Sequence, residues 1–193
     1  MEILAFIWNM RGFGSKDRRR QLRDFLRKEP INIIGLQETI RRDFDVGELE
    51  SLTGSRIFEW HWLASRGHSG GILLRVDSEQ FEVLCKESGS FYVSLTLKQV
   101  KNGKVWECIV VYGPADHTFS EDFLRDLDAK LCRTAIPVMI VGDFNLIHSA
   151  RDKNNDRLDF NLMGFFNDFI AHHQLRELQG VGGGGDFRGL IIR

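Results

Sequence analysis

The sequence lacks the features of a membrane protein, of a secreted disulfide-rich protein and of a strongly basic protein. No apolar run approaches the roughly 20 residues that a membrane-spanning helix needs. The first residues enter a strand-like run without the basic segment, apolar core and cleavage site of a secretory signal. The three cysteines, Cys85, Cys108 and Cys132, are odd in number, far apart and in no Cys-x-x-Cys pair. We therefore expect an intracellular protein whose cysteines are reduced and structural, with no metal bound through them.

The charge is almost balanced, at a formal net value of -1, so net charge does not indicate a nucleic-acid-binding protein. The distribution is uneven, because eight basic residues crowd the first expected helix and the residues before it: Arg11, Lys16, Arg18, Arg19, Arg20, Arg23, Arg27 and Lys28. This pattern is typical both of a solvated helix face and of a phosphate-contacting one, and composition leaves both interpretations open.

The pattern of apolar residues predicts one α/β domain without an internal repeat or an interdomain linker. A chain of 193 residues with a hydrophobic fraction of 42% can bury a substantial core. Periodicity predicts helices near residues 17–28, 46–52, 119–132 and 158–178, and strands near 1–8, 31–36, 56–64, 72–75, 81–86, 91–98, 105–112 and 137–141. Asn102-Gly103 predicts a hairpin between the sixth and seventh strands. We expect two mixed sheets packed face to face and flanked by helices.

Four of these apolar runs end at polar residues that are suited to bind a phosphate or a metal. The runs lead into Asn9 and Arg11, into Gln37 and Glu38, into Tyr112, and into Asp143 and Asn145. In layered α/β proteins, ligands bind outside the carboxyl ends of strands. The sequence therefore predicts an active site assembled from four distant segments.

Each of these residues has a functional and an ordinary interpretation. Glu38 suits magnesium, a hard cation that takes carboxylate oxygens and water, although a glutamate after a buried strand is commonly just solvated. Asp143 could take a proton from water and Asn145 could donate to a phosphoryl oxygen, yet the pair also suits an Asx turn. Tyr112 could donate its phenol to a phosphate or simply close a buried strand. Asn9, a weak ligand by itself, suits a role in orienting the metal shell.

Five motifs together resemble the endonuclease/exonuclease/phosphatase superfamily, which includes deoxyribonuclease I, apurinic endonucleases and inositol-polyphosphate phosphatases. They are Trp8-Asn9-Met10-Arg11-Gly12, Leu36-Gln37-Glu38-Thr39, Ser69-Gly70-Gly71-Ile72, Val111-Tyr112-Gly113-Pro114 and Gly142-Asp143-Phe144-Asn145. The resemblance covers residues 1–178 and is greatest to the endonuclease domain of plant LINE-type (non-LTR) retrotransposons.

The resemblance implies a four-layer α/β sandwich that nicks DNA with Mg²⁺, for which Mn²⁺ can substitute. Glu38 and Asn9 would then serve the metal, and Asp143, Asn145 and Tyr112 would be catalytic. Arg11 and Ser69 would contact the substrate. The resemblance also implies a monomer that acts on DNA, in the nucleus rather than the cytoplasm, without a membrane.

The resemblance ends after Leu178, where the family continues into final strands that carry an aspartate and a histidine. We therefore expect residues 179–193 to be an atypical Gly-rich tail, the final strands to be missing, and hydrolysis by this chain to be slow or absent. A phosphomonoesterase of the same fold and a non-catalytic remnant with weak nucleic-acid binding remain alternatives. A zinc site at His172, His173 and Glu177 is not expected, because the sequence suggests no further ligand of suitable geometry.

Overall fold

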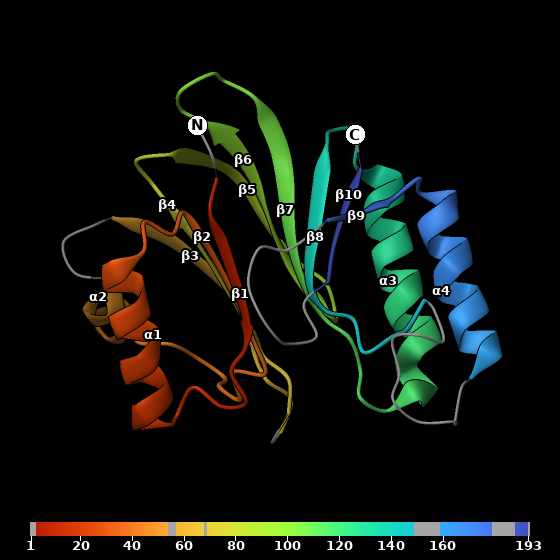
Figure 1. The fold of residues 1–193 in the computed structure, drawn as a ribbon, viewed down its shortest axis with the longest axis horizontal. Coiled ribbons are helices and arrows are strands. Elements are labelled where there is room, and N and C mark those ends of the chain that lie inside the picture. The colour runs from red at the N-terminus through yellow and green to blue at the C-terminus, as the bar shows by residue number, and fades with distance from the viewer. Residues whose placement is uncertain (1–2, 54–56, 68, 149–158, 179–187, 193) are drawn as a thin grey trace.

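A computed structural model describes residues 3–53, 57–67, 69–148, 159–178 and 188–192 (Figure 1). The strands are β1 (Ala5–Asn9), β2 (Ile33–Gln37), β3 (Phe58–Leu63), β4 (Ile72–Asp77), β5 (Phe81–Ser88), β6 (Tyr92–Gln99), β7 (Val105–Tyr112), β8 (Val138–Asp143), β9 (Arg176–Leu178) and β10 (Arg188–Ile192). The helices are α1 (Lys16–Lys28), α2 (Val46–Thr53), a 3-10 turn (His117–Phe119), α3 (Ser120–Arg133) and α4 (Phe160–His172).

The strands form two mixed sheets. One sheet has four strands in the order β1-β2-β4-β3, and the other has six in the order β5-β6-β7-β8-β10-β9. Strand β1 is parallel to β2, and β7 is parallel to β8, while the other pairs are antiparallel. Each sheet thus contains one parallel pair whose carboxyl ends lie at the same edge, which is the arrangement that can bring distant loops together.

Three apolar clusters separate four layers. The first lies between α1, α2 and the four-stranded sheet and includes Phe13, Leu22 and Leu36. The second lies between the sheets and includes Leu74, Leu95 and Val110. The third lies between the six-stranded sheet and α3 and α4 and includes Phe123, Phe144 and Phe166. Figure 1 shows the two sheets in the middle and one helix pair on each outer side, so the predicted four-layer sandwich is confirmed.

Local sequence signals set several of the element ends. The Ser15 hydroxyl accepts a hydrogen bond from the Arg18 N–H (3.4 Å), and the Asp159 carboxylate accepts one from the Leu162 N–H (3.0 Å), so both helices have side-chain N-caps. In the β6–β7 hairpin the N–H of Gly103 donates to the Gln99 carbonyl (2.8 Å), and Gly103 has a φ of 68°. The predicted hairpin is therefore confirmed, and its loop is longer than Asn-Gly alone because β6 ends at Gln99 and β7 begins at Val105.

The end of the chain differs from the prediction. The helix expected over residues 158–178 ends at His172, and Gln174 then takes a φ of 52°, which turns the backbone into β9. The predicted tail contributes β10, which pairs with both β8 and β9. Strand pairing thus continues beyond residue 178. The glycine run at 182–185 lies outside the described residues.

Within the described part of the chain, the helices are all too short or too polar to cross a bilayer.

Candidate active site

The residues that follow β1 and β2 are joined by backbone hydrogen bonds. Asn9 pairs with Gln37 at the ends of the two parallel strands, and beyond them the N–H of Gly12 donates to the Glu38 carbonyl (2.7 Å). Arg11 and Glu38 have φ angles of 47° and 52°, in the left-handed region that side chains disfavour. Such strained backbone persists where the surrounding structure enforces it, and it is common at ligand sites.

A second pair of strand ends, β7 and β8, supplies the other half of the site. Tyr112 pairs with Asp143, and the N–H of Gly113 donates to the Asp143 carbonyl (2.7 Å). Gly142 has a φ of 135°, and a Cβ there would lie 2.2 Å from the Val111 carbonyl oxygen. Because no other residue fits that position without a clash, the glycine before Asp143 lets β8 run close against β7.

One hydrogen bond between side chains joins the two halves. The Asn9 amide Nδ2 donates to Asp143 Oδ2 (3.2 Å), although the residues are 134 positions apart. The other carboxylate oxygen, Oδ1, accepts from the Asn145 N–H (3.0 Å), which is the Asx turn that the sequence left open. Asn9 Oδ1 in turn accepts from the Arg11 N–H (3.3 Å). The Asp143 carboxylate is therefore oriented from both sheets.

The ionisation of Tyr112 shows which charges surround it. Burial, followed by the negative charges of Glu38 and Asp143, raises the pKa of Tyr112 to about 12, while the positive charge of Arg11 acts in the opposite direction. The Tyr112 phenol thus lies within electrostatic reach of both carboxylates, one from each sheet, and remains a protonated donor at neutral pH. The structure thus brings Asn9, Glu38, Tyr112 and Asp143 near one another at the ends of β1, β2, β7 and β8.

Asn145 lies beside these groups with its amide already bonded. Its Nδ2 donates to the Gly113 carbonyl (2.7 Å), and its φ is 50°. The bond holds the loops after β7 and β8 together. An amide nitrogen carries two hydrogens, so the bond leaves one for another acceptor.

The two residues expected to contact substrate have different surroundings. Arg11 is exposed, and its carbonyl accepts a hydrogen bond from the Arg18 guanidinium, which connects the site to α1. Ser69 is exposed in a tight turn, next to a segment in which the Gly70 and Gly71 carbonyls accept from Ile40 and Thr39. The described contacts place the backbone near Ser69 against the segment that follows Glu38, but they do not bring the Ser69 side chain to the carboxylates.

The donor atoms at this site suit a hard divalent cation. Glu38 is half-buried, and within the described residues its carboxylate has no hydrogen bond or ion pair. Asp143 and Asn9 add oxygens close by. An all-oxygen set with two carboxylates is the chemistry that Mg²⁺ prefers. The residues therefore fit the metal that the resemblance implies.

Sequence reasoning gave little weight to Gln37, which is buried between the sheets. Its side-chain Nε2 has no hydrogen-bond partner among the described residues, and it lies 2.8 Å from where a Cβ on Gly142 would stand. A buried amide without a partner is costly unless a ligand or water satisfies it. The signal in the sequence was the polar residue at the last position of an otherwise apolar strand.

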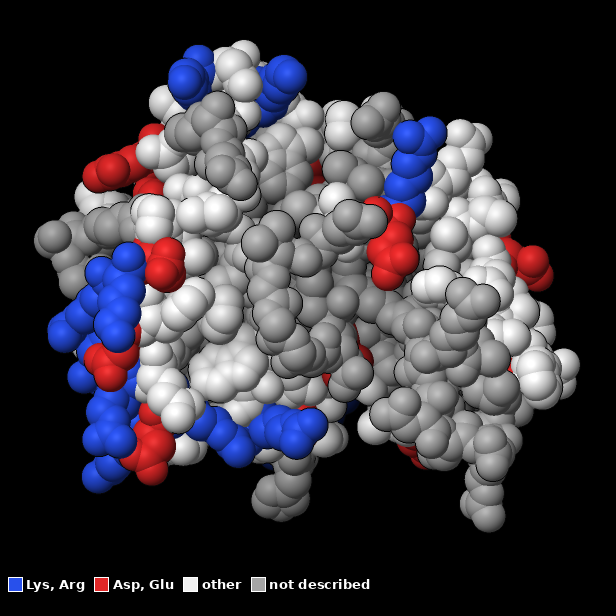
Figure 2. Space-filling view, viewed as in Figure 1, with Lys and Arg blue, Asp and Glu red and all other residues white. Residues whose placement is uncertain are grey.

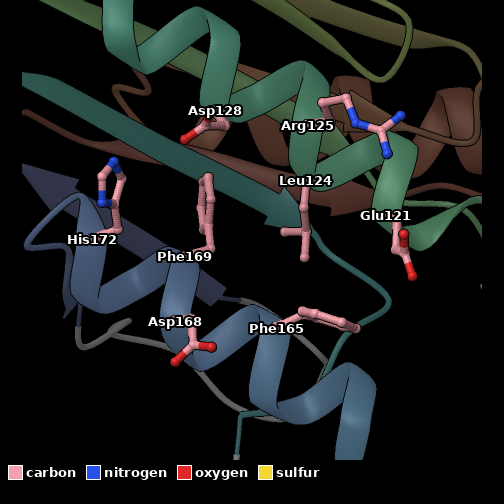
Figure 3. A pocket seen from close by; sticks show the side chains of 8 residues that line it. All are labelled: Glu121, Leu124, Arg125, Asp128, Phe165, Asp168, Phe169 and His172. Carbon is pink, nitrogen blue, oxygen red and sulfur yellow. The ribbon is translucent and has the colours of Figure 1, made fainter.

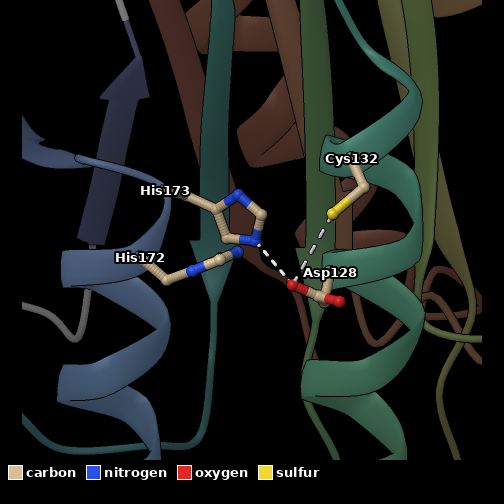
Figure 4. Close-up of side chains that lie close together, drawn as sticks. All are labelled: Asp128, Cys132, His172 and His173. Atoms are coloured by element: carbon tan, nitrogen blue, oxygen red, sulfur yellow. Dashed lines mark hydrogen bonds and ion pairs between the residues drawn. The ribbon is translucent and has the colours of Figure 1, made fainter.

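A second feature, unforeseen from the sequence, lies on the outer helices. A groove of about 500 Å³ runs between α3 and α4 (Figure 3). Its lining combines apolar residues, Leu124, Phe165 and Phe169, with the polar or charged residues Glu121, Arg125, Asp128, Asp168 and His172. It shares no lining residue with the strand-end site. Close to one end, Asp128, Cys132, His172 and His173 lie together (Figure 4).

Comparison with known structures shows where this fold occurs. The AP endonuclease LMAP from Leishmania major is 11% identical, with a TM-score of 0.73 over 97% of this chain and 78% of that one. An AP endonuclease from Archaeoglobus fulgidus is 12% identical, with a TM-score of 0.73 over 98% and 86%. The mannosyl-6-phosphatase Bt3783 from Bacteroides thetaiotaomicron is 10% identical, with a TM-score of 0.62 over 98% and 85%. At these identities the likeness shows a shared fold, and the proteins that share it include nucleases and phosphatases.

The sequence comparison identifies the family. No curated protein sequence matches the chain significantly. The model of the endonuclease/exonuclease/phosphatase family matches residues 7–189 and so includes all four strand ends. Members of this family are typically hydrolytic nucleases and phosphatases that use divalent metals. With its sandwich of two mixed sheets and its match over nearly the whole length, the chain belongs to the endonuclease/exonuclease/phosphatase family.

Proposed function

We propose that the chain is a metal-dependent phosphodiesterase that nicks DNA, derived from the endonuclease domain of a LINE-type retrotransposon. The observation that carries the proposal is the convergence at Tyr112. Glu38 comes from the four-stranded sheet and Asp143 from the six-stranded sheet, and both carboxylates raise the pKa of the same phenol. Two carboxylates and a neutral donor around one point suit the charge and the hydrogen-bonding needs of a metal-bound phosphate.

In this proposal Glu38 is the residue that holds the metal, because its carboxylate is half-buried and has no protein partner among the described residues. A magnesium ion bound there would neutralise charge on the phosphate and on the leaving oxygen. Asn9 donates to Asp143 and so positions that carboxylate, and its amide oxygen faces the Arg11 N–H. Its contribution is to orient the site and only secondarily to bind the metal.

Asp143 would orient the attacking water and accept its proton. It is held at both oxygens, by Asn9 and by the Asn145 backbone, so the carboxylate need not reorganise during the reaction. Tyr112, which stays protonated, donates to a phosphoryl oxygen, and Asn145 donates its second amide hydrogen. The described hydrogen bonds of His61 and His173 go to Glu87, Ser88 and Asp128 rather than to these groups, and we expect slow turnover.

The basic side of the molecule suits a DNA strand that leads to this site. In Figure 2 lysine and arginine side chains gather along the side that α1 occupies. Arg18 connects α1 to the Arg11 loop, whereas Arg19 forms an ion pair with Glu48 (2.7 Å) and so serves the fold. Some basic residues of α1 thus contact other parts of the protein, and others are exposed. We propose that the exposed ones contact phosphates. DNA as the substrate favours a nuclear location, and no described feature requires more than a monomer.

A phosphomonoesterase is the second candidate, because the mannosyl-6-phosphatase from Bacteroides shares the fold. The groups around Tyr112 can handle a single phosphate, and they do not by themselves distinguish an ester from a diester. Hydrolysis of p-nitrophenyl phosphate compared with bis(p-nitrophenyl) phosphate separates the two activities. Higher turnover of the monoester would replace the nuclease proposal.

The metal and the chemistry are tested separately, so that slow turnover does not hide a functional site. Binding of Mn²⁺, followed by electron paramagnetic resonance, should be lost in Glu38→Gln and kept in the matched control Glu79→Gln, an exposed residue. Nicking of supercoiled plasmid should require Mg²⁺ or Mn²⁺ and fall by about 10²–10⁴-fold in Asp143→Asn. Equal Mn²⁺ binding by the Glu38 variant, or nicking that persists in excess chelator, would reject the proposed site.

A further inference from the structure

The outer helices bring together four side chains that the strand-end site does not use. Asp128 and Cys132 lie one turn apart on α3, and His172 and His173 lie at the end of α4. One ligand atom from each residue lies within 4.8 Å of the ligand atoms of all the others. Figure 4 shows the two histidine rings facing the Asp128 carboxylate, with the Cys132 sulfur on the same side of α3.

Part of the cluster is already held in place. His173 Nε2 lies 2.8 Å from Asp128 Oδ1, and the Cys132 Sγ lies 4.0 Å from the same oxygen. The His173 side chain is only 8% exposed and packs edge-on against Phe169, with ring centroids 5.0 Å apart. Cys132 and His172 are exposed. The contact with Asp128, whose side chain is 47% exposed, and the packing on Phe169 thus hold His173 in place, while the exposed Cys132 and His172 leave a path from solvent.

The distances are close to those of a tetrahedral metal site. With metal–ligand bonds of about 2.0–2.3 Å, ligand atoms around zinc lie roughly 3.3–3.8 Å apart. Closing the present cluster therefore requires side-chain movements of about 1 Å. The exposed Cys132 and His172 can make them by rotation about their χ angles, without moving the helices.

The ligand types select the metal. One thiolate, two imidazoles and one carboxylate form a nitrogen- and sulfur-rich set, which favours zinc over magnesium. The strand-end site has oxygen ligands alone, so the two sites would take different metals. We propose that Asp128, Cys132, His172 and His173 bind Zn²⁺ and that the ion clamps α3 to α4. Four protein ligands would close its coordination shell, which is typical of a structural site.

This inference does not depend on the proposed nuclease activity. The alternative at this position is an ordinary hydrogen-bonded pair of His173 and Asp128, with Cys132 and His172 as bystanders. The two interpretations differ in what happens to the thiol. In a metal site Cys132 loses its proton and bonds to the ion, whereas beside a simple ion pair it stays unliganded.

Cobalt(II) is the probe, because it occupies zinc sites and reports its ligands by absorption. The reduced, chelator-treated protein should take up one equivalent with the visible bands of tetrahedral coordination and a thiolate-to-cobalt charge-transfer band. The charge-transfer band should disappear in Cys132→Ser and remain in the matched control Cys85→Ser, another exposed free cysteine. Added Zn²⁺ should displace the cobalt and remove the bands.

Further measurements test whether a loss of cobalt binding reflects the loss of a ligand rather than misfolding, and whether it involves the strand-end site. His172→Gln should weaken cobalt binding by at least about tenfold, because it removes one ligand at an exposed position. Zn²⁺ should raise the thermal unfolding midpoint of the wild type and leave that of Cys132→Ser unchanged. Glu38→Gln should retain the charge-transfer band. A missing band in the wild type, or equal cobalt binding by Cys132→Ser, would leave only the His173–Asp128 pair and overturn the proposal.

Discussion

The pKa of Tyr112 can be measured directly, and its value tests whether the site is assembled. Tyr92, the other tyrosine, is removed by Tyr92→Phe, so that the phenolate absorbance reports Tyr112 alone. An ordinary tyrosine with a pKa of about 10 is about 90% ionised near pH 11. Because burial and the charges of Glu38 and Asp143 raise the pKa of Tyr112 to about 12, it should be only about 10% ionised at that pH.

The charge dependence gives the decisive comparison. Glu38→Gln should lower the pKa of Tyr112, because it removes the larger of the two carboxylate contributions, and Glu79→Gln should leave the titration unchanged. Circular dichroism across the titration must show that the chain stays folded. An ionisation midpoint near 10 in the folded protein, or the same midpoint in both variants, would refute the convergence of the two sheets at this phenol.

The raised pKa also predicts how stability depends on pH. The contribution of a neutral Tyr112 is fully present below about pH 10, the pKa in the unfolded chain, and is lost as the pH rises through about 12. The free energy of unfolding should therefore decrease across this window, and it should decrease less in Tyr112→Phe.

Two further predictions concern the packing that holds the site. Gly142→Ala should lower the free energy of unfolding by about 1–3 kcal/mol or more, because its Cβ would lie 2.2 Å from a strand carbonyl oxygen. Gly103→Ala, with nothing within 4 Å of its Cβ, should lower it by about 1 kcal/mol. Urea titration measures both. Lys130→Met should cost about 3–5 kcal/mol, because it removes the charged partner of the buried Glu107 carboxylate at 2.6 Å and leaves it only the Thr134 hydroxyl. Lys86→Met, in an exposed pair, should cost less than about 1 kcal/mol.

The strand ends that form the candidate site could be predicted from the sequence because their signal is local. Each strand is an apolar run that ends at a polar residue. Because ligands bind at the carboxyl ends of strands, these polar residues are predicted to lie near one another. In the structure Asn9, Glu38, Tyr112 and Asp143 lie at or directly after such strand ends, and Asn9 contacts Asp143. What the sequence could not supply was the role of each atom. The Asn9 amide turns toward Asp143, a partner that its own segment does not reveal.

The end of the chain was harder to predict. Residues after 172 continue an apolar pattern that suits a helix, but Gln174 takes a left-handed conformation and the chain becomes β9. Pairing of β10 with β8 depends on a neighbour about 50 residues earlier, which no local pattern encodes. The α3–α4 cluster was missed for the same reason. His172 and His173 lacked a visible partner until packing of the helices brought Asp128 and Cys132 beside them.

The position of the site at the junction of two sheets has a physical consequence. Glu38 is held by one sheet and Asp143 by the other, so the spacing of the carboxylates depends on the apolar core between the sheets. That core is rigid because it is close-packed, and the Asn9–Asp143 bond joins the two halves at the edge where the core ends. In a site of this kind the loops, and hence the substrate, can differ between proteins while the two carboxylates keep their separation. The nuclease and the phosphatase that share this fold show that one scaffold can serve different substrates.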